Sequence, residues 1–386
     1  MFHIALPEEI KSGKVTDVYF QRTKEILEAE GINRWVTAEL VVKVFPYRAQ
    51  WGVLAGIQES VELLQDLDVK VKCMDEGSIF GAHQPVMTIE GRYLEFGVYE
   101  TAILGLLCQA SGVATKSAHC RKAAENRPVI SFGARRMHPA IAPMIERNAY
   151  IGGCDGVAAV KSAELLGLEP TGTMPHALIL ILGDTVEAAR AFHKVINRKI
   201  NRVVLIDTFN DEKFEALRVA EALGKELFAI RLDTPGTRRG DFVGLMKEIR
   251  WELDLRGFQH VKLFISGGLD EENILKYNEV ADAYGIGTSI SNAPILDFAM
   301  DIVAIEGKPM AKRGKLSGAK EVWRCPKCMT TVVTPESNEC KKNCKCGLTY
   351  EMLLKPLVDS KVLLRELPKP DAIRKYVLKQ LDNFEL

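Results

Sequence analysis

Charged side chains follow several short apolar runs of this sequence. PVISFGA leads into Arg135 and Arg136. RVVLIDT contains Asp207, and LFAIRLDT contains Asp233. An arginine fork suits a carboxylate or a phosphate, and paired carboxylates suit Mg²⁺ and sugar hydroxyls. Asp after a strand is also a common helix N-cap, so a structural role for both acids stays open. Adjacent side chains of an extended segment point in opposite directions, so we expect one of the two arginines to face the site and leave open which.

Two glycine-rich turns follow the last two apolar runs before residue 300. They contain Ser266, Gly267 and Gly268 in FISGG, and Gly285, Gly287 and Thr288 in YGIGTS. Glycine lets backbone N–H groups approach an anion closely, and late loops of β/α barrels commonly hold a phosphate. The pair therefore predicts a phosphate cradle, although each turn on its own would also fit a tight connection between a strand and a helix.

His176 lies in TGTMPHAL, and its role depends on the structure of the apolar run ALILIL after it. If ALILIL is a buried strand, His176 lies at the amino end of that strand, which is the inert face of a barrel. If a short strand covers EPTGTM and a helix starts at Pro175, His176 lies at the reactive carboxyl face. We favour the helix, because proline is preferred at the first helical position.

These residues need a parallel sheet to bring them together, and the middle of the chain predicts one. Apolar strands recur at 128–134, 156–160, 202–208, 227–234, 261–268 and 281–288. Helical patterns lie between them at 186–196, 211–223 and 271–280. Alternating strands and helices of this size imply right-handed crossovers. The fold class is therefore α/β, with a β/α barrel that is complete or falls short of eight units.

The chain divides into three predicted regions. Residues 1–112 form an α+β domain with a helix at 23–31, a strand at 37–46, a helix at 52–67 and turn-rich strands from 69 through YLEFG. Residues 113–300 form the barrel. Residues 301–386 form a C-terminal region with a zinc knuckle near 322–350 and a helical tail.

Five of the nine cysteines crowd into the C-terminal region. We expect Cys325, Cys328, Cys344 and Cys346 to bind zinc, with Cys340 as the substitute for one of them. Cys-Pro-x-Cys followed by a second cysteine turn is typical of structural Zn²⁺, because four thiolates close a tetrahedral site. Five free thiols would be the alternative.

Composition limits the possible partners. The chain of 386 residues has 51 basic and 51 acidic residues, so it has no overall attraction to nucleic acid or anionic membranes. The N-terminus lacks the regions of a signal peptide, and no apolar run approaches the ~20 residues that span a bilayer. We expect a cytoplasmic protein without a membrane partner. A zinc ribbon that binds nucleic acid on an inactive barrel is the alternative of another class, because basic residues such as Lys312, Arg313 and Lys315 lie close to the cysteines.

The combined motifs resemble nicotinate phosphoribosyltransferases. The resemblance rests on GTMPHAL, SFGARR, DTFND, RLDTPG and the SGG and GIGTS turns, together with TDVYFQRT and YRAQWGVLAGI nearer the N-terminus. It covers most of residues 15–300. The cysteine-rich tail is similar to that of a shorter, archaeal-type branch of the family.

The resemblance implies a reaction and roles for residues. Nicotinate attacks C1 of phosphoribosyl pyrophosphate (PRPP), and Mg²⁺-pyrophosphate leaves with help from Asp207 and Asp233. The family couples this step to ATP through a phosphorylated histidine, which His176 matches. Nicotinate would contact Tyr19 of a neighbouring subunit, Thr173 and one of the two arginines, in a homo-oligomer that is a dimer or a ring of dimers.

The chain departs from the family pattern at one strand end, where Thr234-Pro235-Gly236 replaces the usual Ser-Gly-Asp. Quinolinate phosphoribosyltransferase, which shares the architecture, is the nearest alternative. Its substrate carries two carboxylates and is decarboxylated, so its pocket needs more cationic groups. That family also lacks the Gly-Thr-x-Pro-His turn, which favours the nicotinate enzyme.

Overall fold

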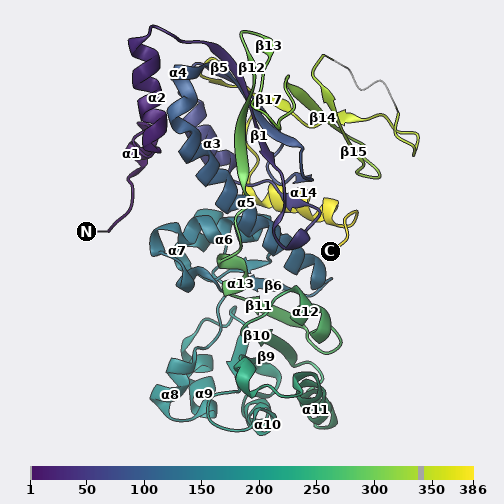
Figure 1. Ribbon diagram of the computed structural model, residues 1–386. Helices are drawn as coiled ribbons and strands as arrows, with labels where there is room; N and C mark the ends of the chain where they lie inside the picture. Colours follow the sequence, from purple (N-terminus) through teal and green to yellow (C-terminus); the bar gives the residue numbers. More distant parts are fainter. Residues whose placement is uncertain (1, 338–342) are drawn as a thin grey trace. The chain divides into compact units, whose positions relative to one another are not determined.

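Six short parallel strands form the sheet that positions the predicted site residues (Figure 1). The computed structural model describes residues 2–337 and 343–386, and this sheet lies in the compact unit Lys116–Ala293, here called the barrel unit. The strand order is β7-β6-β11-β10-β9-β8. The bounds are β6 Val129–Ser131, β7 Gly156–Val157, β8 Arg202–Leu205, β9 Leu227–Leu232, β10 Lys262–Ser266 and β11 Ala283–Ile286.

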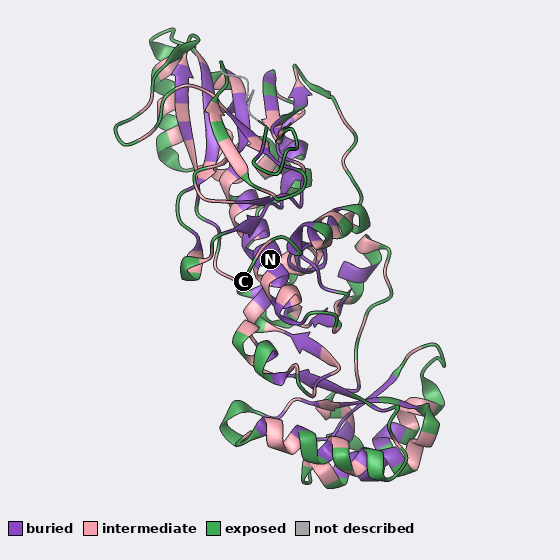
Figure 2. Ribbon diagram, turned by 90° about the vertical axis from the view of Figure 1, so that its right-hand side faces the viewer, coloured by how far each residue is buried: buried purple, intermediate pink, exposed green. Residues whose placement is uncertain are grey.

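Helices follow the strands and cover the sheet. They are α6 Ala142–Ile151, α7 Val160–Leu166, α8 His176–Leu182, α9 Thr185–Val195, α10 Glu212–Leu223, α11 Phe242–Leu255, α12 Glu271–Tyr277 and α13 Thr288–Ser291. The strands are apolar runs because both faces of a parallel sheet are covered. The helices mix buried and exposed residues along their length (Figure 2), as amphipathic helices do.

The sheet is an incomplete barrel whose end strands, β7 and β8, are joined by an extended segment. The Thr171 N–H donates to the Val157 carbonyl at 2.8 Å, and the Met174 N–H approaches the Val203 carbonyl at 3.5 Å. Residues 171–174, here called the closing segment, therefore lie between the two end strands. The prediction of a barrel short of eight units is confirmed in this form.

The closing segment also decides the ambiguity at ALILIL. Pro175 is extended, with φ −84° and ψ 154°, and the helix α8 begins at His176. It ends at Gly183, whose φ of 80° is the left-handed conformation that favours glycine. The prediction of a helix was correct, so His176 enters from the carboxyl edge of the sheet. The helix begins one residue later than predicted, because Pro175 is its extended N-cap, and residues 169–174 do not form the predicted strand.

The second compact unit combines Met1–Thr115 with Pro294–Leu386 and is here called the antiparallel unit. Its main sheet has the order β13-β12-β1-β5-β3-β17-β18. The strands are β1 Trp35–Val42, β3 Val69–Cys73, β5 Pro85–Arg92, β12 Phe298–Ile305, β13 Lys308–Pro309, β17 Lys355–Asp359 and β18 Val362–Leu363. The residues beyond 300, which the sequence suggested as a separate region, thus belong to the same unit as the N-terminal residues.

Smaller elements complete the antiparallel unit. Two small sheets pair β2 Gly52–Val53 with β4 Ile79–Phe80, and β14 Lys320–Arg324 with β15 Thr331–Pro335 and β16 Glu351–Met352. The helices are α1 Pro7–Lys11, α2 Val18–Ala29, α3 Ile57–Leu64, α4 Tyr93–Phe96, α14 Pro370–Leu381 and α5 Glu100–Ala123, which continues into the barrel unit.

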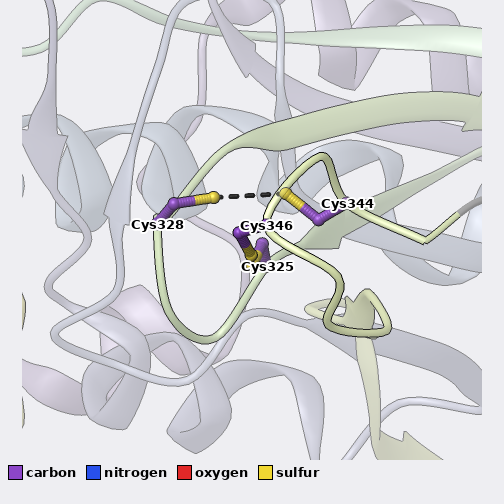
Figure 3. A group of neighbouring side chains, drawn as sticks. All are labelled: Cys325, Cys328, Cys344 and Cys346. Carbon is purple, nitrogen blue, oxygen red and sulfur yellow. Dashed lines mark hydrogen bonds between the residues drawn. The ribbon is translucent and has the colours of Figure 1, made fainter.

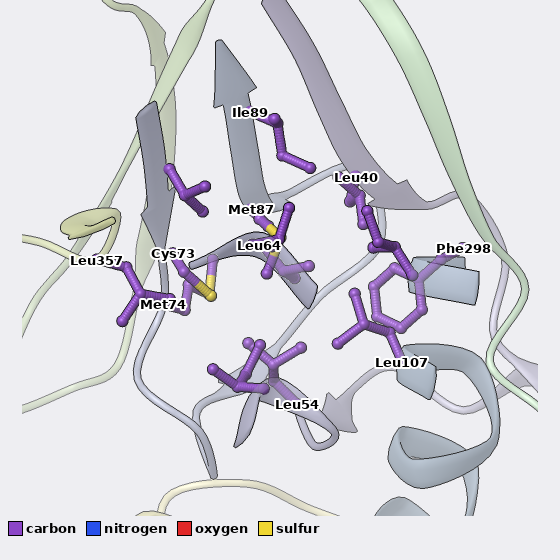
Figure 4. Close-up of a cluster of buried hydrophobic side chains, with 14 of the residues drawn as sticks. Leu40, Leu54, Leu64, Cys73, Met74, Met87, Ile89, Leu107, Phe298 and Leu357 are labelled. Carbon is purple, nitrogen blue, oxygen red and sulfur yellow. The ribbon is translucent and has the colours of Figure 1, made fainter. Parts of the chain in front are cut away.

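One apolar core holds the antiparallel unit together. Leu40 of β1, Met87 and Ile89 of β5, Leu107 of α5 and Phe298 of β12 pack in it (Figure 4). All five side chains are at most 3% exposed. Because the core takes residues from both ends of the chain, neither end can form this sheet alone.

Two predicted elements of the N-terminal region were wrong in extent or type. The pattern GVLAGIQESVELLQDL predicted one helix, but its first residues form β2 and only Ile57–Leu64 is helical. YLEFG predicted an alternating strand but forms α4.

The stretch Tyr93–Ala123 is long and apolar enough to cross a membrane by length and composition alone, and 56% of its most apolar window is buried in the structure. The core helix of a soluble protein passes the same test.

Glu146 offers a test of how the barrel unit fixes the connection after β7. Its side chain is fully buried in α6 and accepts the Ala158 and Ala159 N–H groups at 3.0 and 2.9 Å. We expect Glu146→Ala to lower the free energy of unfolding by about 3 kcal/mol, because two partly buried donors lose a buried, charged acceptor. Glu146→Gln should cost roughly half, since one acceptor oxygen remains. Urea unfolding measures both, and equal losses for the two variants would contradict this role.

Candidate active site

The predicted site residues line up along the carboxyl edge of the parallel sheet. Following the strand order, Arg135 and Arg136 come after β6, Gly285 to Thr288 at the end of β11, and Ser266 to Gly268 at the end of β10. Asp233 follows β9, Asp207 follows β8, and His176 follows the closing segment. Ligands of α/β proteins bind at this edge of the sheet.

His176 and Asp207 form the first contact of the site. The His176 Nε2 lies 3.1 Å from the Asp207 Oδ1, and the two side chains are 38% and 4% exposed. An ionised Asp207 accepts a hydrogen bond from the N–H at Nε2, so the proton stays on Nε2 and the lone pair lies on Nδ1. The contact orients an imidazole that is open to a ligand on one side.

The environment of the Asp207 side chain disfavours its ionised form. Burial raises the pKa of the Asp207 carboxyl, and the nearby Asp233 raises it further, while His176 acts in the opposite direction. Neither acid caps a helix: the caps of α10 and α11 are Asp211 and Asp241. The alternative role of Asp207 and Asp233 as helix N-caps was therefore wrong.

Arg231 is the centre of the polar network, and the sequence analysis missed it. Its Nε donates to the Ser266 hydroxyl at 2.8 Å and its Nη1 donates to the Thr173 hydroxyl at 2.6 Å. Its Nη2 lies 3.4 Å from the Asp233 Oδ1. The guanidinium also covers the Phe132 ring, 5.0 Å from the centroid. Burial lowers the pKa of Arg231, and Asp233 opposes that effect.

A signal for Arg231 was present in the sequence. Alternate residues of a strand point to the same face, so Arg231 must share a face with Asp233, two positions later. A cation inside the apolar run LFAIRL also needs a partner. Both arguments single out Arg231 without a structure.

Ser266 and Thr173 act within this network. The Ser266 hydroxyl accepts from Arg231 and donates to the Asp233 Oδ1 at 2.7 Å, and its residue is 1% exposed. The Thr173 hydroxyl accepts from Arg231. Both side chains therefore order charged groups of the site.

A cavity of about 410 Å³ opens beside this network. Its lining combines the two glycine turns with three arginines and two acids: Phe132, Arg135, Arg136, Arg231, Asp233, Ser266, Gly267, Gly268, Leu269, Asp270, Gly285, Gly287, Thr288 and Ser289. Both Arg135 and Arg136 line it, contrary to the expectation of one. The reason is local, because Ala134–Arg136 is a 3₁₀ turn rather than an extended segment, and its side chains do not alternate.

Gly285 shows why one of these turns requires glycine. A Cβ atom there would lie 2.4 Å from the Phe132 ring and 2.9 Å from the Phe264 ring. The missing side chain lets Phe132 lie across the end of β11, where the ring forms part of the cavity wall. Gly285 thus shapes the wall through packing.

Tyr19 lies in the antiparallel unit, unlike the other residues predicted to contact the substrates. Its hydroxyl donates to the Asp17 Oδ2 at 3.1 Å, and Asp17 in turn accepts from the Thr101 hydroxyl at 3.1 Å. The ring remains 57% exposed. The Thr-Asp-x-Tyr motif therefore anchors itself to the start of α5 and presents an aromatic ring.

The predicted cysteine cluster forms in the structure (Figure 3). The sulfur atoms of Cys325, Cys328, Cys344 and Cys346 all lie within 4.8 Å of one another. Tetrahedral Zn–S bonds of about 2.3 Å separate sulfurs by about 3.8 Å, so the donor set fits zinc. Hydrogen bonds from the Thr330 hydroxyl and backbone lower the pKa of Cys328 to about 6, which favours the thiolate that binds metal. Cys340, the predicted substitute, lies outside the described residues.

Three of the basic residues before this cluster contact carboxylates within the antiparallel unit. Lys312 and Lys315 contact the buried Asp301, and Lys320 contacts the buried Glu39 at 2.8 Å. Two carboxylates, on the β12 and β1 strands, offset part of the charge of these three lysines. These pairs weaken the argument for a nucleic-acid surface.

Comparisons with known proteins agree with this geometry. Residues 17–111 match the quinolinate phosphoribosyl transferase N-terminal domain, and residues 113–301 match the corresponding C-terminal domain. Together with the sheet edge and its site, these matches define the class: a type II phosphoribosyltransferase.

Individual relatives show which family of this class the chain belongs to. Nicotinate phosphoribosyltransferase pncB2 of Mycobacterium tuberculosis is 31% identical over 353 residues, covering 80% of this chain and 74% of the relative. The chain belongs to the nicotinate phosphoribosyltransferase family. A Bacillus subtilis nicotinate phosphoribosyltransferase is 27% identical, covering 82% of this chain and 70% of the relative.

Two solved structures share the fold over nearly the whole chain. A nicotinate-nucleotide pyrophosphorylase from Pyrococcus furiosus has 51% identity and a TM-score of 0.98, covering 100% of this chain and 99% of that one. Human nicotinic acid phosphoribosyltransferase has 18% identity and a TM-score of 0.73, covering 96% and 94%. The human likeness shows the fold alone.

The environment of Asp207 leads to a prediction about stability. Because the pKa of Asp207 is raised in the folded protein, its ionised form is unfavourable above that pKa, and this cost vanishes as the carboxyl takes up a proton at lower pH. We expect Asp207→Asn to raise the Tm at pH 7.5 by roughly 1–3 °C. The gain should shrink as the pH falls towards 4.

Thermal unfolding across this pH range measures the effect. Asp68→Asn is the matched control, because Asp68 is an exposed carboxylate and should show no comparable gain. A Tm of Asp207→Asn below that of the native protein at pH 7.5 would contradict the prediction.

The cysteine cluster leads to a prediction about metal content. We expect about one zinc per chain, measured by atomic absorption after purification in reducing buffer. Cys344→Ser should lose the zinc and lower the Tm, since metal binding contributes folding free energy. Cys340→Ser should retain zinc, and loss of zinc from that variant alone would overturn the assignment of the four ligands.

Proposed function

We propose that this protein transfers a phosphoribosyl group from PRPP to the ring nitrogen of nicotinate, giving nicotinate mononucleotide and pyrophosphate. The observation that carries the proposal is the single sheet edge that joins His176 and Asp207 to the Arg231 network and to the cavity with both glycine turns. The names of the curated relatives support the same reaction.

The cavity suits the phosphate of a phosphorylated sugar. Arg135 and Arg136 bring two cations to it, and the Gly267–Gly268 turn brings backbone N–H groups. Gly285, Gly287 and Thr288 form the opposite turn. Guanidinium groups and backbone amides together are the usual donors to a phosphate dianion.

The acids suit the leaving pyrophosphate. Asp207 and Asp233 are oxygen donors of the kind that hold Mg²⁺, and a cation beside them relieves the strained charge on Asp207 that burial and Asp233 create. When bound, Mg²⁺ supplies positive charge to the pyrophosphate oxygens. The Nδ1 lone pair of His176, oriented by the contact of Nε2 with Asp207, would accept a phosphoryl group from ATP. Only the protonated ring would have a second N–H to donate to the leaving group.

The pyridine ring and its carboxylate need a flat surface and a cation. Phe132 and Arg231 provide them in the cavity wall, where the guanidinium lies over the Phe132 ring. We assign the carboxylate to Arg231 together with Arg135 or Arg136, and Thr173 to the positioning of Arg231. Tyr19 would close over the ring from a second copy of the chain, because it is an exposed ring in α2, a helix with no buried residue.

Quinolinate is the second candidate substrate, because both matched domain descriptions carry that name. The Pyrococcus furiosus neighbour, a nicotinate-nucleotide pyrophosphorylase, also favours this second candidate. One assay separates these possibilities.

We expect pyrophosphate release when the protein receives PRPP and Mg²⁺ with nicotinate, and at least 100-fold less with nicotinamide or quinolinate. Nicotinamide leaves the largely buried Arg231 without a carboxylate, and quinolinate brings a second carboxylate that has no cation assigned to it; either mismatch should cost more than about 2.7 kcal/mol. Coupled pyrophosphate detection measures each reaction. Release with quinolinate, accompanied by CO₂, would replace nicotinate by the second candidate.

His176→Asn tests the role of the imidazole in the same assay. We expect the rate to fall by about 100-fold or more and any stimulation by ATP to disappear. His193→Asn is the control, because His193 belongs to α9 and contacts Arg198 and Arg202. Unchanged ATP stimulation in His176→Asn would exclude a phosphorylated His176.

A further inference from the structure

Arg239 lies beside the Gly267–Gly268 turn but outside the wall of the cavity. Its Nε donates to the Thr234 carbonyl at 2.7 Å, and its Nη2 donates to the Ser266 carbonyl at 2.8 Å and also contacts the Gly267 carbonyl. The guanidinium lies over the Phe242 ring, 4.7 Å from the centroid. One side chain thus joins the loops that follow β9 and β10.

The planarity of the peptide group turns this contact into a constraint on the turn. In a trans peptide the carbonyl and the next N–H point in opposite directions. Because Arg239 holds the Ser266 and Gly267 carbonyls on its own side, the Gly267 and Gly268 N–H groups must point away from it. Within residues 2–337 and 343–386, neither N–H donates a hydrogen bond to the protein.

The backbone needs such a restraint. Gly267 and Gly268 both have positive φ, at 84° and 61°, and glycine reaches that region as readily as others. A turn of two glycines therefore has many accessible conformations. Gly267 also has no room for a side chain, because a Cβ would lie 2.9 Å from the Arg239 Nη2 and 3.1 Å from Asp233.

We propose that Arg239 is a positioning residue for phosphate binding: its guanidinium holds two carbonyls of the Ser266–Gly268 turn away from the cavity, so that two glycine N–H groups face a phosphate. This inference deepens the proposed function and rests on it for the identity of the phosphate as that of PRPP. Arg239 lies in the loop Thr234–Gly240, where this chain departs from the Ser-Gly-Asp pattern. The loop with this different sequence then supplies Arg239, whose side chain fixes the Ser266–Gly268 turn.

The test uses ribose 5-phosphate as a probe, so that it does not depend on turnover. We expect Arg239→Met to weaken its binding by about 10- to 100-fold in titration calorimetry. Arg239→Lys should recover only part of the loss, because an ammonium lacks the planar fork of the guanidinium. Arg238→Met is the control: Arg238 is the exposed neighbouring residue, and its loss removes the same charge from the same loop.

Amide signals report the mechanism directly. Labelling with ¹³C′-serine and ¹⁵N-glycine selects four glycines, Gly13, Gly112, Gly267 and Gly318. In the native protein the Gly267 signal should shift on addition of inorganic phosphate, and in Arg239→Met it should not. In turnover, the KM for PRPP should rise about tenfold while the KM for nicotinate stays unchanged.

Native-like affinity of Arg239→Met for ribose 5-phosphate, or equal weakening in Arg238→Met, would overturn the inference. If Arg239→Met does not fold, Arg239→Lys carries the same comparison against Arg238→Lys, and equal affinities overturn it. If the native protein binds ribose 5-phosphate, Arg239→Met weakens that binding and nicotinate is not used, the proposed function is contradicted while the role of Arg239 stays supported.

Discussion

The charge on Arg231 is the constraint from which the site of the barrel unit is built. A buried guanidinium is costly unless it is paired and hydrogen-bonded, and each partner that meets this need comes from a different segment. Asp233 follows the same strand, Ser266 ends β10, Thr173 belongs to the closing segment, and Phe132 follows β6. Pairing this one charge therefore holds four segments of the chain together. The contact with Thr173 has a further consequence, because it anchors the segment that leads three residues later to His176, opposite Asp207.

The same arrangement leaves the site electrostatically incomplete. Burial disfavours the ionised form of Asp207 and also the charged form of Arg231. One effect acts on a negative charge and the other on a positive charge. A ligand that carries both a metal cation and anionic groups therefore relieves both. Substrates with a carboxylate, a phosphate and a metal-bound pyrophosphate have this composition. The chain thus retains groups that are unfavourable for folding at the place where ligands compensate for them.

Much of this site could be predicted from the sequence, because strand ends in a parallel sheet are set by the order of apolar runs. Asp207, Asp233 and the glycine turns were found in this way. Arg231 was missed because it lies inside an apolar run. The run was assigned to a strand from its hydrophobic residues, and the face that Arg231 shares with Asp233 was overlooked. The orientation of Arg135 and Arg136 could not be predicted, since it depends on a 3₁₀ turn whose residues are compatible with an extended chain. The helix after Pro175 was decided by hydrogen bonds of the closing segment to β7 and β8, which are contacts distant in sequence.

The boundary at residue 300 was misleading for a topological reason. In the antiparallel unit, β1 pairs with β5 on one side and with β12 on the other, and β3 pairs with β17. Two of these partners come from residues after the barrel unit, so the chain leaves one sheet, forms another and returns to finish the first. A strand whose partners lie more than 200 residues away gives no local sign of its pairing. The cysteine cluster lies on the returning segment between β14 and β17, a stretch with short strands and few buried residues. A metal held by Cys325, Cys328, Cys344 and Cys346 would close that loop through its coordinate bonds, and so would shorten the flexible path by which β17 finds β3.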